Sequence, residues 1–141
     1  MLASAAPAAS PMPDKAKTFL QARQLTEIGS LELVFIKGQL HFNDNNRKMI
    51  SQWAEKIVKY NIPVYIHSSA SPPSGIRNMS EDIARHEAIR LAFNRALIAK
   101  TLLESNGISE NRLMVNIRDP APEKRKNQFP DILIITHHQT Q

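Results

Sequence analysis

The sequence of 141 residues contains no cysteine, only four glycines and no long apolar run. The lack of cysteine excludes disulfides and thiolate metal sites, and it leaves the cellular compartment open. The scattered glycines form no phosphate-binding loop, and there is no nucleophile elbow and no recognisable Ser/His/Asp arrangement. No stretch approaches the roughly 20 apolar residues of a membrane span. We therefore predict a chain that is not an enzyme, binds no cofactor and has no membrane-spanning helix.

The histidines also lack the spacing of a metal site. No pair of them has the H-x-x-x-H spacing, or a carboxylate spacing, that would place ligands on one face of a helix. Two are adjacent near the C-terminus and would point to opposite faces of a strand. We therefore predict no metal site from these residues, which are His41, His67, His86, His137 and His138.

The composition indicates one globular domain, because 42% of the residues are hydrophobic and lie in patterned segments. The formal net charge of +5 at pH 7 is modest. Either solubility explains this positive charge, or the chain binds an anionic partner such as cell-wall polymer, lipid head groups or nucleic acid. A basic cluster at residues 124–126 is diluted by Glu123 and Asp119 and has no aromatic platform. The cluster therefore favours a solvated loop over a nucleic-acid site.

The N-terminal residues 1–13, MLASAAPAASPMP, contain five alanines, three prolines and no charge. This composition is typical of a linker, and the segment lacks the basic start of a signal peptide. It is similar to the tethers that follow the lipidated cysteine of bacterial lipoproteins. Residues 14–29 are predicted as a short helix or linker, with Asp14 as a possible N-cap. Residues 137–141 are predicted as a frayed tail.

Hydrophobic patterns predict alternating strands and helices in the remaining chain. Asn43 or Asn45 would cap the first of these helices, whose apolar stripe includes Trp53 as a core residue. The short connection that follows this helix implies a right-handed βαβ unit. Strands are predicted at residues 31–37, 64–67, 112–117 and 131–136, with a serine- and proline-rich loop at 68–80. The order βαβαββ predicts a two-layer α/β sandwich with a mixed four-stranded sheet.

The best-specified element is a long helix over residues 81–106. Ser80 would cap its start, and Gly107 followed by Ile108 predicts a Schellman stop. The apolar residues of this helix fall on one broad arc, and Arg95 falls inside that arc. Because an isolated buried charge is very unfavourable, Arg95 must either extend outward along its stem or be held by a carboxylate.

A motif without gaps spans residues 95–113. Its matched positions are Arg95-Ala96, Ala99, Leu103, Gly107-Ile108 and Arg112-Leu113. Their spacing is similar to the signature R-A-x-x-V/A-x-x-x-L-x-x-x-G-I/V-x-x-x-R-L of the OmpA-like domain, an envelope module that typically binds peptidoglycan. The resemblance covers roughly residues 30–136, which we take as the domain, and it implies the same two-layer fold.

The resemblance implies a ligand site in which an arginine and an aspartate together hold the diaminopimelate of the peptide stem. Arg95 matches the arginine, and Ser71 stands by position where the aspartate would be, if the extra loop residues are placed elsewhere. The serine before the family's R-A pair is Ala92 here, and the family's terminal arginines are absent. We therefore take Arg95 and Ser71 as the candidate ligand-binding residues and expect peptidoglycan binding to be weak or lost.

A relocated acid would restore such a site. The candidates are Glu81, Asp82 and Glu87 near the start of the long helix. Carboxylates at a helix N-terminus interact favourably with the helix dipole. We favour this stabilising role over ligand binding for all three residues.

Three functions remain open on the sequence. The first is a structural part of a cell-envelope assembly, such as a secretion apparatus, with weak or absent peptidoglycan binding. The second is a peptidoglycan anchor that binds diaminopimelate, and the third is a small basic nucleic-acid-binding module that only the charge supports. The resemblance favours the first two. It implies a periplasmic location in a Gram-negative bacterium, other envelope proteins as partners, no nucleic acid, and attachment to the outer membrane only through a lipid tether outside this chain.

Overall fold

The computed structural model describes residues 23–73, 75, 77–120 and 131–138. The predicted linker and the basic cluster at residues 124–126 lie outside the described residues. Residues 23–27 are helical. The elements that follow are β1 (Leu31–Val34), α2 (Asp44–Ile57), β2 (Val64–Ser69), α3 (Glu81–Ser105), a short 3-10 helix (Glu110–Arg112), β3 (Leu113–Ile117) and β4 (Ile132–Thr136).

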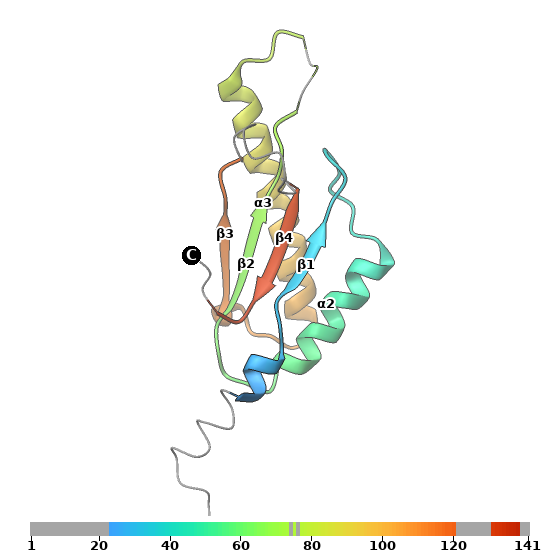
Figure 1. Ribbon diagram of the computed structural model, residues 1–141, viewed down its shortest axis with the longest axis vertical. Helices are drawn as coiled ribbons and strands as arrows, with labels where there is room; N and C mark the ends of the chain where they lie inside the picture. The colour runs from blue at the N-terminus through green and yellow to red at the C-terminus, as the bar shows by residue number, and fades with distance from the viewer. Residues whose placement is uncertain (1–22, 74, 76, 121–130, 139–141) are drawn as a thin grey trace, which may run out of the picture.

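The four strands form one mixed sheet in the order β1-β4-β2-β3 (Figure 1). β4 runs antiparallel to β1 and to β2, and β2 runs parallel to β3. β1 and β2 therefore run in the same direction and are connected through α2. They are not neighbours in the sheet, because β4 lies between them. The predicted βαβαββ order and the mixed four-stranded sheet are confirmed.

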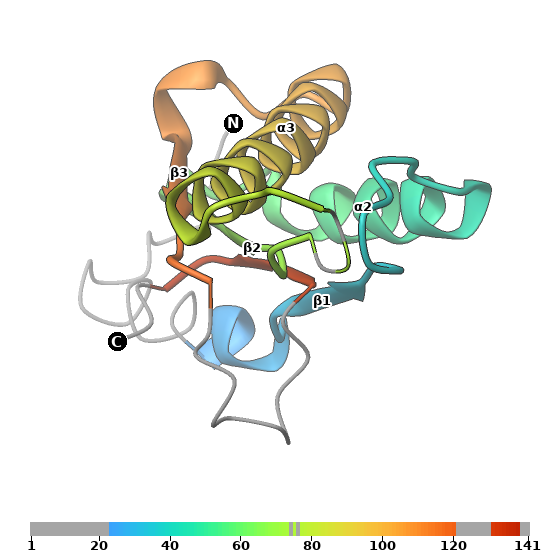
Figure 2. The same ribbon diagram turned by 90° about the horizontal axis from the view of Figure 1, so that it is seen from above.

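α2 and α3 cover one face of the sheet and form the second layer (Figure 2). α2 begins with a capping box, in which the side chains of Asn43 and Asn46 each accept a hydrogen bond from the other's backbone amide. α3 begins at Ser80, whose hydroxyl oxygen accepts a hydrogen bond from the Ile83 amide. Asn43 is therefore the cap among the two asparagines considered, and Ser80 caps the long helix as predicted.

The C-terminus of α3 is a complete Schellman motif. The Ile108 amide donates to the Leu103 carbonyl at 3.2 Å, and the Gly107 amide donates to the Glu104 carbonyl at 3.0 Å. Gly107 has a φ of 98°, a left-handed conformation that glycine adopts without steric cost. The predicted end of the helix near Asn106 is therefore confirmed.

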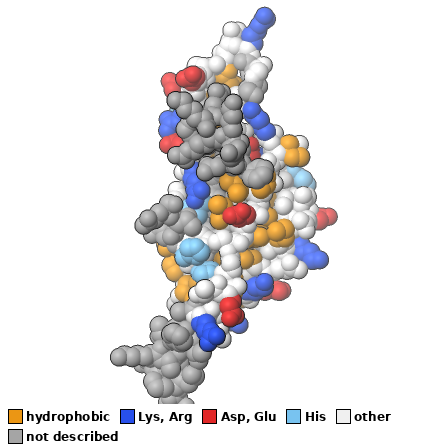
Figure 3. Space-filling view, in the orientation of Figure 1, with side chains coloured by type: hydrophobic (Ala, Val, Ile, Leu, Met, Phe, Trp, Pro, Cys, Tyr) orange, Lys and Arg blue, Asp and Glu red, His pale blue; other side chains and the backbone are white. Residues whose placement is uncertain are grey.

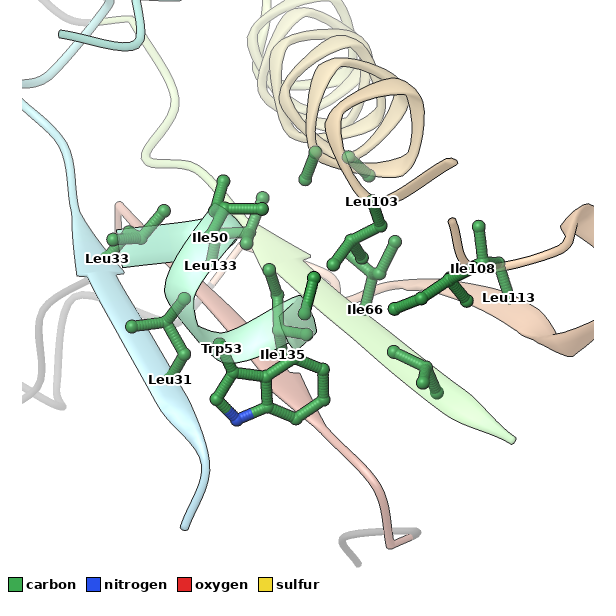
Figure 4. Close-up of a cluster of buried hydrophobic side chains, with 14 of the residues drawn as sticks. Leu31, Leu33, Ile50, Trp53, Ile66, Leu103, Ile108, Leu113, Leu133 and Ile135 are labelled. Atoms are coloured by element: carbon green, nitrogen blue, oxygen red, sulfur yellow. The ribbon is translucent and has the colours of Figure 1, made fainter. Parts of the chain in front are cut away.

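The core lies between the sheet and the two helices (Figure 4). Ile66 of β2 and Leu133 and Ile135 of β4 are fully buried in it. Trp53 of α2 belongs to the same cluster, and its indole Nε1 donates to the Gly29 carbonyl at 2.8 Å. Trp53 is therefore a core residue, as predicted, and its one polar atom is hydrogen-bonded.

The face of the sheet away from α2 and α3 has a mixed surface (Figure 3). Hydrophobic side chains lie there among acidic, basic and histidine side chains. Val34 of β1 and Met114 of β3 are about half-exposed, and they alternate along their strands with residues buried in the core. Among the helices that the structure describes, none is long and apolar enough to cross a membrane.

β1 is shorter and β2 is longer than the sequence predicts. β1 ends at Val34, opposite Ile132 where its partner β4 begins, and the chain then turns at Gly38, which has a φ of 78°. β2 continues to Ser69, since Ser68 and Ser69 both pair with β4. The Ser68 hydroxyl donates to the Ala92 carbonyl of α3 at 2.7 Å, which satisfies a buried polar group inside the strand.

β3 and β4 each begin one residue later than predicted. Arg112 belongs to the 3-10 helix, and its guanidinium donates to three carbonyl oxygens at the end of α2 and in the turn that follows. These acceptors are the carbonyls of Ile62 at 2.9 Å, Ile57 at 3.2 Å and Val58 at 3.3 Å. Arg112 thus donates to carbonyls at and just beyond the C-terminus of α2, of which that of Ile57 also accepts from the Tyr60 amide at 3.0 Å.

His137, the first residue of the predicted tail, contacts the segment before β1. Its Nε2 donates to the Ile28 carbonyl at 2.7 Å. His138 follows with its Nδ1 at 3.1 Å from the Thr136 hydroxyl, while residues 139–141 lie outside the described residues. These contacts attach the first part of the tail to the domain.

Candidate functional site

Arg95 lies on the core side of α3, and its side chain has no exposed surface. Its Nε and one terminal nitrogen donate to the Gln39 carbonyl, and the same terminal nitrogen also donates to the Ile36 carbonyl at 3.3 Å. The guanidinium carbon lies 4.6 Å from the ring centroid of Phe35, within cation–π range. The connection between β1 and α2 therefore wraps around the guanidinium.

The counter-ion of Arg95 is Asp131, the residue before β4. The Arg95 Nη1 donates to the Asp131 Oδ1 at 2.8 Å, and the aspartate side chain is only 6% exposed. Of the two alternatives that the sequence leaves open for Arg95, the structure has the second. A carboxylate holds it inside the protein.

Ser71 completes this cluster from the loop after β2. Its backbone amide donates to the Asp131 Oδ1 at 3.2 Å, and its hydroxyl donates to the Asp131 Oδ2 at 2.6 Å. Asp131 thus links the two candidate ligand-binding residues, Arg95 and Ser71, and both of its oxygens accept hydrogen bonds from the protein. The buried ion pair is therefore electrically neutral, and its polar atoms are hydrogen-bonded within the protein. We call Arg95, Asp131 and Ser71 the closed cluster.

Sheet topology brings these residues together. The end of β2 pairs with the start of β4, since Ser69 lies opposite Ile132 in the antiparallel register. Ser71, after the end of β2, and Asp131, before the start of β4, therefore lie at the same end of these two strands. They are beside the face of α3 that includes Arg95. The arrangement needs β4 between β1 and β2, which the order of elements along the chain does not reveal.

The acids that the sequence suggested as replacements lie elsewhere. Glu81, Asp82 and Glu87 are all exposed on the first turns of α3. Glu87 approaches Arg90 at 3.8 Å on the helix surface. The acid that meets Arg95 is instead Asp131, which was predicted to be the first residue of the last strand. The signal that could have identified it is an acidic residue directly before the apolar run ILIIT, where a charge must find a partner as the strand becomes buried.

A pocket with a volume of about 350 Å³ adjoins the cluster and shares Ser71 with it. Lys37 from the β1–α2 connection and Pro73 from the loop after β2 form part of its wall. Ile83, Glu87 and Leu91 line it from α3. Its lining is mainly apolar, so it differs in character from the buried ion pair next to it.

His67 is a buried titratable residue that lies outside this cluster. It lies on β2, is 2% exposed and stacks on the Tyr65 ring, with ring centroids 6.3 Å apart. Burial, and secondly the positive charge of Arg118, lower the pKa of His67 below its ordinary value of 6.5. Among the described residues, no group of three histidine or acidic side chains is placed to hold a metal ion.

Together, the strand order and the two helices on one face of the sheet define an OmpA-like fold. Among solved structures, the chain is similar to the OmpA-like domain of FopA1 from Francisella tularensis, with 13% sequence identity and a TM-score of 0.58 over 76% of this chain and 70% of that chain. It is also similar to the peptidoglycan-associated lipoprotein from Burkholderia pseudomallei, with 10% identity and a TM-score of 0.56 over 76% and 89% of the two chains. A third similar structure is the cell wall anchor of the T6SS from Pseudomonas aeruginosa, with 14% identity and a TM-score of 0.52 over 78% and 81%.

No protein-family model matches the sequence, and no curated protein matches it. At identities between 10% and 14%, the three structural similarities establish the fold alone. They do not show which residues of this chain bind a ligand.

Proposed function

We propose that this chain is a non-enzymatic, periplasmic OmpA-like domain that forms a structural part of a cell-envelope assembly and binds peptidoglycan weakly or not at all. The observation behind this proposal is the closed cluster in which Asp131 pairs with Arg95 at 2.8 Å. In the family, the guanidinium of this arginine would meet a carboxylate of the ligand. In this chain, the Arg95 guanidinium already pairs with the Asp131 carboxylate.

The proposed loss of binding follows from charge. Diaminopimelate presents an ammonium group and carboxylates, so its recognition in the family requires an acid and an arginine that both face the ligand. Here Arg95 has no exposed surface, and Ser71 offers a hydroxyl that already donates to Asp131. A hydrogen bond to a charged group contributes roughly 1.5–3 kcal/mol. The loss of one such contact therefore lowers affinity by about ten- to a hundredfold.

The envelope location is supported by the fold. Two of the similar structures are by name a peptidoglycan-associated lipoprotein and a cell wall anchor of a secretion system. Residues 1–13 would be the linker that follows a lipid tether in the outer membrane, and other envelope proteins would be the partners. The nucleic-acid alternative rests only on the net charge and on a cluster outside the described residues.

Co-sedimentation with purified cell-wall sacculi tests the proposal. The full chain should remain in the supernatant, and calorimetry with a diaminopimelate-containing muropeptide should detect no binding. Micromolar binding that free diaminopimelate displaces would establish the anchor function instead.

A double variant makes the test sharper. Ser71→Asp combined with Asp131→Ser moves the acid from the closed cluster to the family's position and leaves the charge of the chain unchanged. We expect this variant to pellet with sacculi more than the parent chain does. The matched control is Ser71→Asn combined with Asp131→Ser, which also opens the cluster but supplies no acid. Equal pelleting by the two variants would contradict the role of the acid.

A further inference from the structure

β1 forms one edge of the described sheet and pairs there with β4 alone (Figure 1). The Phe35 amide donates to the Asp131 carbonyl at 2.9 Å, in line with the antiparallel register of the two strands. Because hydrogen-bonded residues alternate along an antiparallel strand, the backbone groups of Leu33 and Phe35 point toward β4. Those of Glu32 and Val34 therefore point the other way, across the free edge of the sheet.

The side chains of this edge alternate between the core and the outer face of the sheet, which is the face away from α2 and α3 (Figure 3). Val34 is 52% exposed, and the alternation continues past β1 to Ile36, which is 69% exposed. Glu32 is also exposed, and it takes part in no ion pair with the described residues. The edge therefore presents two apolar side chains and one carboxylate that lacks a counter-ion within the described chain.

The free edge indicates what kind of group could cover it. A row of backbone donors and acceptors at strand spacing is matched by another extended chain. Antiparallel pairing is the more stable of the two arrangements, and it places the side chains of opposite residues on the same face. β-Branched residues opposite Val34 and Ile36 would bury apolar surface there. A lysine or arginine opposite Glu32 would supply the opposite charge.

A second copy of this chain matches the edge less well than a basic segment does. Antiparallel pairing of two identical edges about a two-fold axis places outer-face residues opposite outer-face residues. Within residues 32–36, Glu32 would lie opposite Glu32, Val34 or Ile36 of the other copy. None of these is a cation, and like charges directly opposite each other are destabilising. The edge therefore favours a different chain over self-association.

We propose that the free edge of β1 binds an extended segment of a partner protein by antiparallel strand addition. The segment has a basic residue opposite Glu32 and β-branched residues opposite Val34 and Ile36. The inference rests on the proposed function, because it names the contact by which a structural domain of an assembly engages its partner. Main-chain hydrogen bonds provide the affinity, and the charge of Glu32 selects the partner and its register.

Binding of a defined peptide to the full, isotope-labelled chain tests the proposal by amide NMR. The probe is the acetylated and amidated peptide Val-Thr-Val-Thr-Lys, whose two valines and lysine would lie opposite Ile36, Val34 and Glu32 in that order. It should bind with a dissociation constant of roughly 1 mM, and the amide shifts should concentrate at residues 31–36. At saturating peptide, the Glu32 and Val34 amides should exchange with solvent more slowly, because they gain acceptors.

N-methylation of the peptide separates backbone pairing from side-chain contact. A methyl group on the nitrogen of the central valine removes the donor that would meet the Val34 carbonyl, so it should abolish binding. The matched control has the methyl group on the nitrogen of the first threonine, which points away from β1 in this register. The control peptide should still bind. Equal loss of binding by the two methylated peptides, or no binding of the parent peptide, would overturn the proposal.

Reversal of the charge on both sides tests the role of Glu32. Glu32→Lys should weaken binding of the lysine peptide at least about threefold. The same variant should bind the peptide with glutamate in place of lysine better than the parent chain does. Glu55→Lys is the control, because it makes the same charge change at an exposed position of α2. It should bind both peptides as the parent chain does. Shifts at β3 in place of β1, or equal weakening by both variants, would contradict the assignment.

The same labelled sample separates this proposal from the function on which it rests. Addition of a diaminopimelate-containing muropeptide should cause no shifts. Micromolar muropeptide binding would overturn the proposed function. Failure of the strand peptide together with no muropeptide binding would overturn only the strand-addition site.

Discussion

Arg95 and Asp131 are separated by 36 residues, yet they form a buried ion pair with a 2.8 Å contact. Further contacts fix the pair, since Ser71 donates to the carboxylate and the Gln39 carbonyl accepts from the guanidinium. The pair connects the last strand, the long helix and two loops at one edge of the sheet. The pair is therefore a structural junction of the fold.

Asp131→Asn should destabilise the domain by about 3 kcal/mol in urea unfolding, because it leaves the Arg95 cation buried without a counter-ion. Asp119→Asn is the control, since Asp119 pairs with Arg85 at the same 2.8 Å distance but on the surface. That change should lower the free energy of unfolding by at most about 1 kcal/mol. Similar losses in the two variants would show that burial of the pair has no energetic role.

Gly107→Val should destabilise the domain by roughly 1–2 kcal/mol, because a β-branched residue is strained at positive φ. The added Cβ would also lie 3.2 Å from the Val58 Cγ2. Gly29→Ala is the control, because a Cβ there meets no atom within 4 Å. Thermal unfolding of both variants checks this expectation. An unchanged melting temperature for Gly107→Val would mean that the Schellman stop is dispensable.

Arg112→Met should lower the free energy of unfolding by about 1–2 kcal/mol, because three carbonyls around the end of α2 each lose a charged donor. Arg112→Lys should recover only part of this loss, since an ammonium group lacks the planar fork of donors. Arg90→Met removes a mostly exposed arginine of α3 and serves as the control. Denaturant titration of the three variants measures the differences. If lysine restores full stability, charge alone explains the role of Arg112.

The buried His67 should make stability depend on pH. Because its pKa is lowered in the folded state, the unfolded chain binds more protons over the interval between the folded-state pKa and the ordinary value of 6.5. The free energy of unfolding should therefore fall as the pH drops through about 6.5, and it should level off below the folded-state pKa.

Urea unfolding at about pH 7 and pH 5 measures this dependence. His67→Asn should reduce the difference between the two conditions, since the variant lacks the titrating group. His41→Asn replaces an exposed histidine and should preserve the difference of the parent chain. A variant at position 67 with the full pH dependence would assign the effect to other groups.

Local signals predicted much of the fold. The caps at Asn43 and Ser80 and the stop at Gly107 each depend on a few neighbouring residues, so the sequence locates both helices closely. The strand ends were less accurate, because they depend on neighbours in the sheet. Ser68 and Ser69 resemble loop residues in the sequence, but pairing with β4 and a bond to Ala92 make them strand residues.

The candidate site was predicted in part. Arg95 was recognised as a charge that needs a partner, and Ser71 was placed in the same site through the resemblance to a known family. Asp131 was missed because the insertion of β4 beside β2 is a long-range pairing that no local pattern records. Whether Arg95 and Ser71 bind a ligand stays a prediction for the sacculus and muropeptide experiments.

The central position of β4 has a consequence for the order in which the domain assembles. β1 occupies an edge of the described sheet and pairs there with β4 alone. It therefore has no neighbour in this sheet until β4 has been synthesised. Of the strand pairings in the described sheet, a nascent chain that ends before residue 131 retains only that of β2 with β3. Such long-range closure is slow. We therefore expect a chain that stops before residue 131 to stay unfolded and to be degraded by proteases.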